Sequence, residues 1–166
     1  MVEHLPELID PLALAEKNRQ FKGSMPVSKM TRMQDILLRR EGEVRFELRF
    51  GKDGKFAVIT GMVEADLELQ CQCCLGAIAC PVSSRVSLAV VGSVDEAGLL
   101  PGCYEPLLFD KANIPLADII QEELLLALPT IPQHGRCEAY KPKEKGPKLE
   151  IPERPNPFAV LAKLKK

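Results

Sequence analysis

Three of the six cysteines of this chain fall within the four residues 71–74, in the stretch LQCQCCLGAI. Cys71 and Cys74 are separated by two residues, a spacing that lets both thiolates face one tetrahedral ion. His134 and Cys137 repeat this spacing much later in the chain. These four residues are therefore candidate ligands of a metal site. Zinc is the metal that such a set of Cys and His ligands favours.

Two other roles for these cysteines remain open. Free cysteines often pack as small apolar side chains, so the same residues also fit a group of buried thiols. The gap between the two pairs is longer than in short zinc modules. A redox CxxC motif usually opens a helix, whose dipole lowers the pKa of the attacking thiol. The pattern after Cys74 predicts a strand instead, which argues against thiol-disulfide chemistry.

The metal candidate lies at the tip of a predicted β-hairpin. Apolar and polar residues alternate from Val63 to Cys71 and again from Ile78 to Val90, as in half-buried antiparallel strands. This alternation places Cys71 on the core side. An earlier strand is expected from Val44 to Phe50, followed by a turn at Asp53-Gly54. Near Gly61 the alternation changes phase, which predicts a β-bulge.

Helices are expected at both ends of the chain. Asp10-Pro11 is a typical helix start and predicts a helix to about Gln20, which Gly23 to Pro26 would end. Met30, Met33 and Leu37 then recur at helical spacing. The last of the predicted helices in the domain begins at Pro115 and stops at Pro129. The carboxylates expected on its solvent face are Asp118, Glu122 and Glu123.

These elements predict an α+β fold with a meandering antiparallel sheet that could close towards a barrel. Tyr104 to Phe109 is expected to add an edge strand. We predict one domain over residues 1–140. Residues 141–166 are expected to form a basic, proline-rich tail that ends in a short helix.

The composition indicates a globular protein, since 46% of its 166 residues are hydrophobic. No stretch approaches the roughly 18 consecutive apolar residues of a membrane helix, and the N-terminus does not resemble a signal peptide. We therefore expect a cytoplasmic protein with no membrane partner. In that reducing compartment cysteines are expected as thiols or metal ligands.

The charge is uneven along the chain, although the net charge is only −1. Residues 141–166 carry eight Lys or Arg against three Glu, which suits contact with a polyanion and is also typical of a solvated tail. Apolar residues at helical spacing in the tail could dock on a partner. The candidate RNA or partner contacts are Lys141, Lys143, Lys145, Lys148, Arg154, Phe158, Lys163, Lys165 and Lys166.

Several motifs together resemble the YceD family, the bacterial large ribosomal RNA subunit accumulation proteins. They are the LxCQxC hairpin, YEP at Tyr104 to Pro106, LALPTIP at Leu126 to Pro132, the HxxC pair and the terminal PNPFAVLAKLKK. The resemblance implies a cytoplasmic, non-enzymatic factor for the synthesis, processing or stability of large-subunit ribosomal RNA. It also implies a shared metal-type constellation at Cys71, Cys74, His134 and Cys137. Cys73 departs from the pattern and leaves open which clustered thiols bind.

The expected partner is large-subunit ribosomal RNA or a pre-ribosomal particle. The alternative is a protein-binding adaptor for a ribosomal protein or assembly factor, with no direct RNA contact. No catalytic residue and no small-molecule substrate are expected, because the sequence has no glycine-rich phosphate loop and no histidine placed beside a serine nucleophile.

Overall fold

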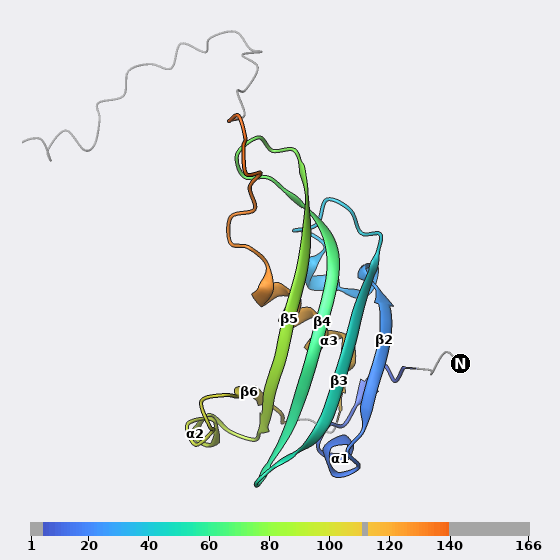
Figure 1. Cartoon of the computed structure of the whole chain (residues 1–166). Coiled ribbons are helices and arrows are strands. Elements are labelled where there is room, and N and C mark those ends of the chain that lie inside the picture. Colours follow the sequence, from blue (N-terminus) through green and yellow to red (C-terminus); the bar gives the residue numbers. More distant parts are fainter. Residues whose placement is uncertain (1–4, 111–112, 140–166) are drawn as a thin grey trace, which may run out of the picture.

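The computed structural model describes residues 5–110 and 113–139 of the chain. A five-stranded sheet in the order β2-β3-β4-β5-β6 forms the body of the fold, and α3 packs against one face of it (Figure 1). A separate two-stranded sheet joins β1 to β7. The elements are β1 (Leu8–Ile9), α1 (Pro11–Glu16), β2 (Gln20–Pro26), η1 (Val27–Lys29), η2 (Thr31–Met33), β3 (Glu43–Asp53), β4 (Phe56–Gln70), β5 (Ala77–Val91), α2 (Val94–Ala97), β6 (Glu105–Leu108), β7 (Ile114–Pro115) and α3 (Leu116–Ala127).

The predicted meander is confirmed for β3 to β5, which pair antiparallel in chain order. β2, which the sequence did not predict, adds a further antiparallel strand beside β3. β6 confirms the expected edge strand, but it pairs parallel to β5. The parallel pairing is possible because the loop that contains α2 carries the chain back before β6 begins. Within the described residues the sheet stays open, with β2 and β6 at its edges, so no closed barrel forms.

The core lies between the sheet and α3. Alternate residues of each strand face it, as the sequence pattern predicts. α3 buries Leu116, Ile119, Ile120 and Leu124 against them. The buried apolar side chains on the strands of this face are Phe21, Met25, Val44, Phe46, Leu48, Phe50, Ala57, Ile59, Val63, Ala65, Leu67, Leu69, Val82, Val86, Leu88 and Val90.

The N-terminal region differs from its prediction. α1 starts at Pro11 with the Asp10 side chain accepting hydrogen bonds from backbone N–H groups, as expected, but it ends at Glu16. Residues 20–26 form β2, so the helix to Gln20 and the break after it are wrong. Phe21 and Met25 are both buried. Their four-residue spacing fits one face of a strand as well as one face of a helix.

Met30, Met33 and Leu37 are buried, but they do not share a helix. The chain makes two single turns instead, η1 and η2. The Met33 N–H donates to the Met30 carbonyl oxygen at 3.2 Å, which closes one of these turns. The three-residue spacing of 3₁₀ turns also directs such side chains to one side. The apolar pattern therefore predicted burial correctly and helix length wrongly.

β4 is one regular strand, so the bulge predicted near Gly61 is wrong. Its register with β3 and β5 is unbroken. The phase of the pattern changes because Phe56 and Val58 are buried on the opposite face, in a small second cluster with Ala89. The partly buried residues that pack against this cluster come from the loop after α2 and are Leu100 and Tyr104.

Glu123 is not on the solvent face of α3, where the sequence placed it. It is 6% exposed, and Ser84 Oγ on β5 donates a hydrogen bond to its carboxylate at 3.0 Å. Burial raises the pKa of the Glu123 carboxyl above its usual value, and Glu105 adds to this effect, while the Ser84 hydrogen bond opposes it. The folded protein therefore holds this carboxyl proton more tightly than the unfolded chain does.

Replacement of Glu123 by Gln is expected to stabilise the protein at pH 7.5 by up to about 1 kcal/mol, because a neutral amide avoids the cost of a buried charge. Since the folded-state pKa is raised, wild-type stability should fall as pH rises from about the usual value of 4.5 through the raised pKa. Thermal melts at pH 4.5 and pH 7.5 measure both effects. Glu122→Gln is the control, since Glu122 is about half exposed and paired with Arg32. A variant that is less stable at pH 7.5 would contradict this prediction.

The division into a domain of residues 1–140 and a tail of residues 141–166 remains a prediction. The predicted tail lies outside the described residues. Among the residues that the structure describes, no helix is long and apolar enough to cross a membrane.

Candidate metal centre

The loop between β4 and β5 folds back on itself at the end of the long hairpin. The Cys71 N–H donates to the Gly76 carbonyl oxygen at 2.8 Å, and the Leu75 N–H donates to the Cys71 carbonyl oxygen at 2.9 Å. Leu75 has a left-handed backbone, with φ of 61°. This tight turn brings Cys74 back towards Cys71, which ends the core side of β4 and is fully buried. The predicted position of Cys71 is therefore confirmed.

The segment after α3 runs to this hairpin tip (Figure 1). The Gln72 N–H donates to the Pro132 carbonyl oxygen at 2.8 Å, which joins the tip to the segment shortly before His134. The Cys73 thiol lies 3.6 Å from the Cys137 carbonyl oxygen, within donating distance. Backbone contacts on both sides of the second ligand pair thus hold it against the first.

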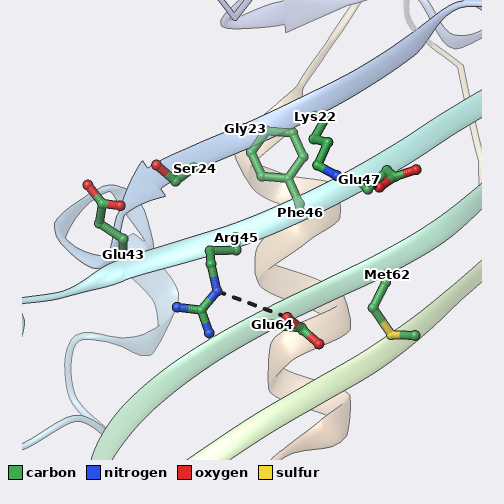
Figure 2. Close-up of a pocket in the computed structure, with 9 residues that line it drawn as sticks. All are labelled: Lys22, Gly23, Ser24, Glu43, Arg45, Phe46, Glu47, Met62 and Glu64. Carbon is green, nitrogen blue, oxygen red and sulfur yellow. Dashed lines mark ion pairs between the residues drawn. The ribbon is translucent and has the colours of Figure 1, made fainter. Parts of the chain in front are cut away.

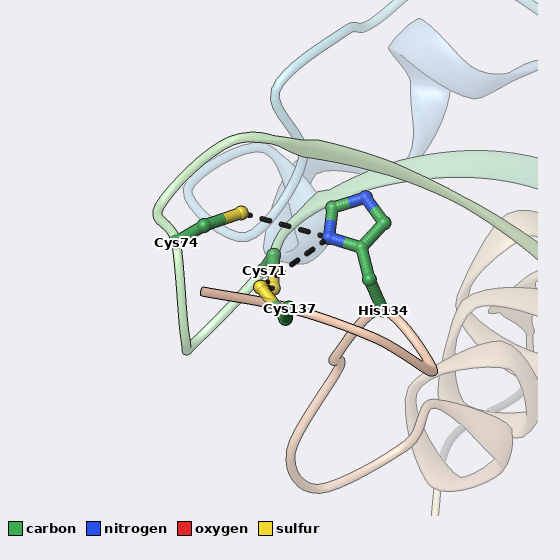
Figure 3. Close-up of side chains that lie close together, drawn as sticks. All are labelled: Cys71, Cys74, His134 and Cys137. Carbon is green, nitrogen blue, oxygen red and sulfur yellow. Dashed lines mark hydrogen bonds between the residues drawn. The ribbon is translucent and has the colours of Figure 1, made fainter. Parts of the chain in front are cut away.

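The side chains of Cys71, Cys74, His134 and Cys137 converge, and their ligand atoms all lie within 4.8 Å of one another (Figure 3). The Sγ atoms of Cys71 and Cys137 are 3.6 Å apart. His134 Nδ1 is 3.6 Å from Cys74 Sγ and 3.9 Å from Cys137 Sγ. Zn–S bonds of about 2.3 Å place two sulfurs of a tetrahedral site about 3.8 Å apart. The spacing of these atoms therefore fits a four-ligand zinc site.

The other nitrogen of the His134 ring has its own partner. Nε2 lies 3.2 Å from the Ala77 carbonyl oxygen, an atom that can only accept a hydrogen bond. The ring proton therefore belongs on Nε2, and the lone pair of Nδ1 faces the three thiols. Metal-bound histidines usually show this arrangement, in which a backbone carbonyl fixes the tautomer and the ring orientation.

The surroundings favour a thiolate at Cys71. The backbone N–H of Cys74 is the main cause that lowers the Cys71 pKa, to about 5, and the backbone N–H groups of His134 and Cys73 add to it against the cost of burial. The Cys137 pKa is raised, first by its contact with Cys73 and then by burial and the other two thiols. These opposite shifts favour the thiolate at Cys71 over the thiolate at Cys137. Metal binding would release the protons of the thiols that it coordinates.

Comparison with known proteins identifies the family. The sequence profile described as large ribosomal RNA subunit accumulation protein YceD matches residues 59–165, a range that contains all four clustered residues. A protein of Haemophilus influenzae described as large ribosomal RNA subunit accumulation protein YceD is 31% identical over 167 aligned residues, which are 97% of this chain and 96% of that relative. This chain belongs to the YceD family. No solved structure matches it.

The clustered thiols of this YceD-family chain divide into ligand candidates and one neighbour. Cys73 is not among the four residues whose ligand atoms converge, so the geometry favours Cys71 and Cys74 as the ligands from this turn. Cys80 is partly buried beside the core, and burial raises its pKa. Cys103 is exposed in the loop before β6. None of these three cysteines belongs to the convergent group.

The predicted contact residues of the tail, Lys141, Lys143, Lys145, Lys148, Arg154, Phe158, Lys163, Lys165 and Lys166, lie outside the described residues. Sequence reasoning missed the backbone groups that support the cluster, namely the carbonyls of Ala77 and Pro132. Backbone carbonyls have no side-chain signature. The only available signal for Pro132 was its place in the LALPTIP motif, which the family resemblance already included.

Proposed function

We propose that this YceD-family protein is a non-enzymatic, cytoplasmic factor that supports the synthesis, processing or stability of large-subunit ribosomal RNA. The description of the H. influenzae relative as a large ribosomal RNA subunit accumulation protein supports this biological role. The observation that carries the molecular part of the proposal is the convergence of two ligand pairs from distant parts of the chain.

The cluster would act as a structural zinc site. Three thiolates and one imidazole complete a tetrahedral shell, which leaves no open position for a substrate or for an activated water. When bound, zinc would supply a cross-link between the β4–β5 tip and residues 134–137. The ligands come from the hairpin through Cys71 and Cys74 and from the segment after α3 through His134 and Cys137. This cross-link would also fix the point from which the basic tail departs.

The proposed partner is large-subunit ribosomal RNA, alone or within a pre-ribosomal particle. The basic composition of residues 141–166 supports this choice, since lysines and arginines bind RNA mainly through its phosphates. Binding of this kind depends strongly on salt and weakly on base sequence.

Affinity purification of the tagged full-length protein is expected to enrich large-subunit ribosomal RNA at low salt and much less at high salt. The reason is that each phosphate contact releases counterions, so the affinity falls steeply as salt rises. Quantitative measurement of large- and small-subunit RNA in the eluates tests this. Small-subunit RNA is the internal control. Equal recovery of both RNAs, or recovery of neither at any salt concentration, would contradict the proposal.

A protein-binding adaptor is the second candidate, and exposed apolar side chains beside a groove favour it. Leu126 is 72% exposed and Ile131 is 67% exposed. The groove beside them, between α3 and the segment after η2, is lined by Ile36, Leu128 and Pro132 among others. An exposed apolar patch of this kind often marks a protein contact. Tight binding of RNA by the purified protein alone would rule out a purely indirect role.

A further inference from the structure

Among the described elements, no helix packs on one face of the sheet. α3 and the main core cover the opposite face (Figure 1). On the uncovered face the strand register places side chains in straight rows across β2 to β5. The strand register defines two neighbouring rows near the centre of this face. The first row is Gln20, Arg49, Thr60 and Ser87, and the second is Lys22, Glu47, Met62 and Arg85.

The charges on this face are separated along the strands. The two rows contain Arg49, Lys22 and Arg85 against a single acid, Glu47. Arg19, which directly precedes β2, lines a hollow together with Arg49 and adds a further positive charge. Towards the metal cluster the same face becomes acidic, and its carboxylates there are Glu43, Glu64, Asp66 and Glu68. We call the first region the basic half of the uncovered face, defined by Arg19, Lys22, Arg49 and Arg85.

The arginines of the basic half are available for a ligand. In the described part of the chain, no carboxylate lies within ion-pair distance of Arg19 or Arg85. Arg49 makes one exposed contact, with Glu47 at 3.3 Å. Exposed ion pairs of this kind contribute little, so a phosphate can compete for this guanidinium.

In the acidic region, Arg45 differs from these arginines because it has carboxylate partners. Arg45 lies 4.0 Å from Glu64 and 3.4 Å from Asp66, so two carboxylates neutralise it. Figure 2 shows Arg45 directed at Glu64 on the neighbouring strand, with Glu43 also on this part of the face. Arg45 and Arg85 are thus exposed arginines of the same face in opposite electrostatic surroundings.

Two adjoining hollows shape the basic half. The larger has a volume of about 680 Å³ and is lined by Arg49, Thr60, Met62, Arg85 and Tyr104 among others. The smaller, of about 300 Å³, contains Arg19 and shares Arg49 and Thr60 with the first. Hollows of this size can hold parts of a nucleotide.

The larger hollow offers more than charge. Met62 is 41% exposed on its floor. The hydroxyl of Tyr104 donates to Asp53 at 2.9 Å, which holds its ring in place beside the hollow. Aromatic and other apolar side chains accept the face of an unpaired base, while guanidinium groups bind the backbone. The combination of exposed apolar side chains with guanidinium groups therefore fits single-stranded RNA better than an RNA duplex.

We propose that the basic half of the uncovered sheet face binds a single-stranded RNA segment, with Arg19, Arg49 and Arg85 contacting its phosphates. This inference rests on the proposed role with ribosomal RNA and assigns a surface to it. Met62 and Tyr104 contact a base. The tail lysines provide a second, separate group of phosphate contacts.

The test uses the full-length protein and a short fluorescent oligouridine, titrated by anisotropy between about 50 and 200 mM salt. Arg85→Gln is expected to weaken binding several-fold, whereas Arg45→Gln, its matched control, is expected to leave it unchanged or strengthen it. The triple variant Arg19→Gln, Arg49→Gln, Arg85→Gln should lower the slope of log K against log salt by about 2 and weaken binding at least tenfold, because each single-strand phosphate contact contributes about 0.7 to the slope. Circular dichroism and thermal melting verify that each variant is folded.

Each other outcome has a distinct meaning. A triple variant with the wild-type slope and affinity would overturn the surface assignment. If Lys163→Gln, Lys165→Gln, Lys166→Gln then abolished binding, RNA contact would belong to the tail, and the proposed function would stand. A wild-type protein that binds no oligouridine would overturn this inference, and the purification of ribosomal RNA described above would separately decide the proposed function.

Discussion

Cys71→Ser is expected to abolish zinc binding and to lower the free energy of unfolding by about 3 kcal/mol. The serine hydroxyl cannot replace a thiolate as a zinc ligand at neutral pH. Zinc binds the folded chain, in which the two ligand pairs meet, much more tightly than the unfolded chain, so loss of the metal removes a stabilisation of a few kcal/mol. Elemental analysis of protein purified without chelator measures the zinc, and urea denaturation measures the stability.

Cys73→Ser is the matched control for this prediction, because Cys73 lies in the same turn but outside the convergent group. It should retain about one zinc per chain and most of the stability. Cys103→Ser, in an exposed loop, should change neither quantity. Wild-type protein that contains no zinc and melts at the same temperature with and without chelator would show that the four residues are packed thiols. That result would leave the family assignment untouched.

Gly61→Ala is expected to disrupt the sheet, with a loss of more than about 4 kcal/mol. A Cβ atom at this position would lie 1.9 Å from the Glu47 carbonyl oxygen and 3.1 Å from the Leu48 Cα. Both atoms belong to the backbone of β3, so no side-chain rotation can relieve the overlap. The central pair of strands would have to separate where Leu48 is fully buried. Denaturant unfolding, or loss of soluble protein on expression, measures the effect.

Gly102→Ala provides the comparison for Gly61→Ala. A Cβ at Gly102 would meet no atom within 4 Å, so its effect should stay within about 0.5 kcal/mol, as for other surface substitutions. The two variants make the same chemical change. Equal stability of both would mean that β3 and β4 can move apart at Gly61 without loss of packing.

The sequence predicted the parts of the fold that depend on local patterns. The alternation from Val44 to Phe50 and the Pro115 and Pro129 boundaries of α3 gave elements of the correct type and place. It failed at residues 20–26, where Gly23 and Pro26 predicted a break, because an edge strand such as β2 tolerates both residues. It also failed at Phe56 and Val58, because a second cluster on the opposite face requires the loop near Leu100, whose position is set only by tertiary packing.

The candidate site was predictable to a similar extent. The two-residue spacing within each pair selected Cys71, Cys74, His134 and Cys137 before any geometry was known, and the structure brings them together. The sequence could not show which of the clustered thiols face the second ligand pair, since their directions depend on the turn around Leu75. The basic half of the uncovered face was also missed, because its arginines come from separate strands and become neighbours only through the register.

The small sheet of β1 and β7 has a consequence for synthesis of the chain. Ile9 pairs with Ile114, and the Glu7 carbonyl oxygen accepts from the Leu116 N–H at 3.0 Å. β1 is synthesised before the other described strands, but its partner β7 is the next-to-last element of the described fold. A nascent chain stalled before residue 114 would leave β1 unpaired, even with the β2–β5 meander complete. Pairing of β1 is therefore a late step of co-translational folding, although β1 lies near the N-terminus.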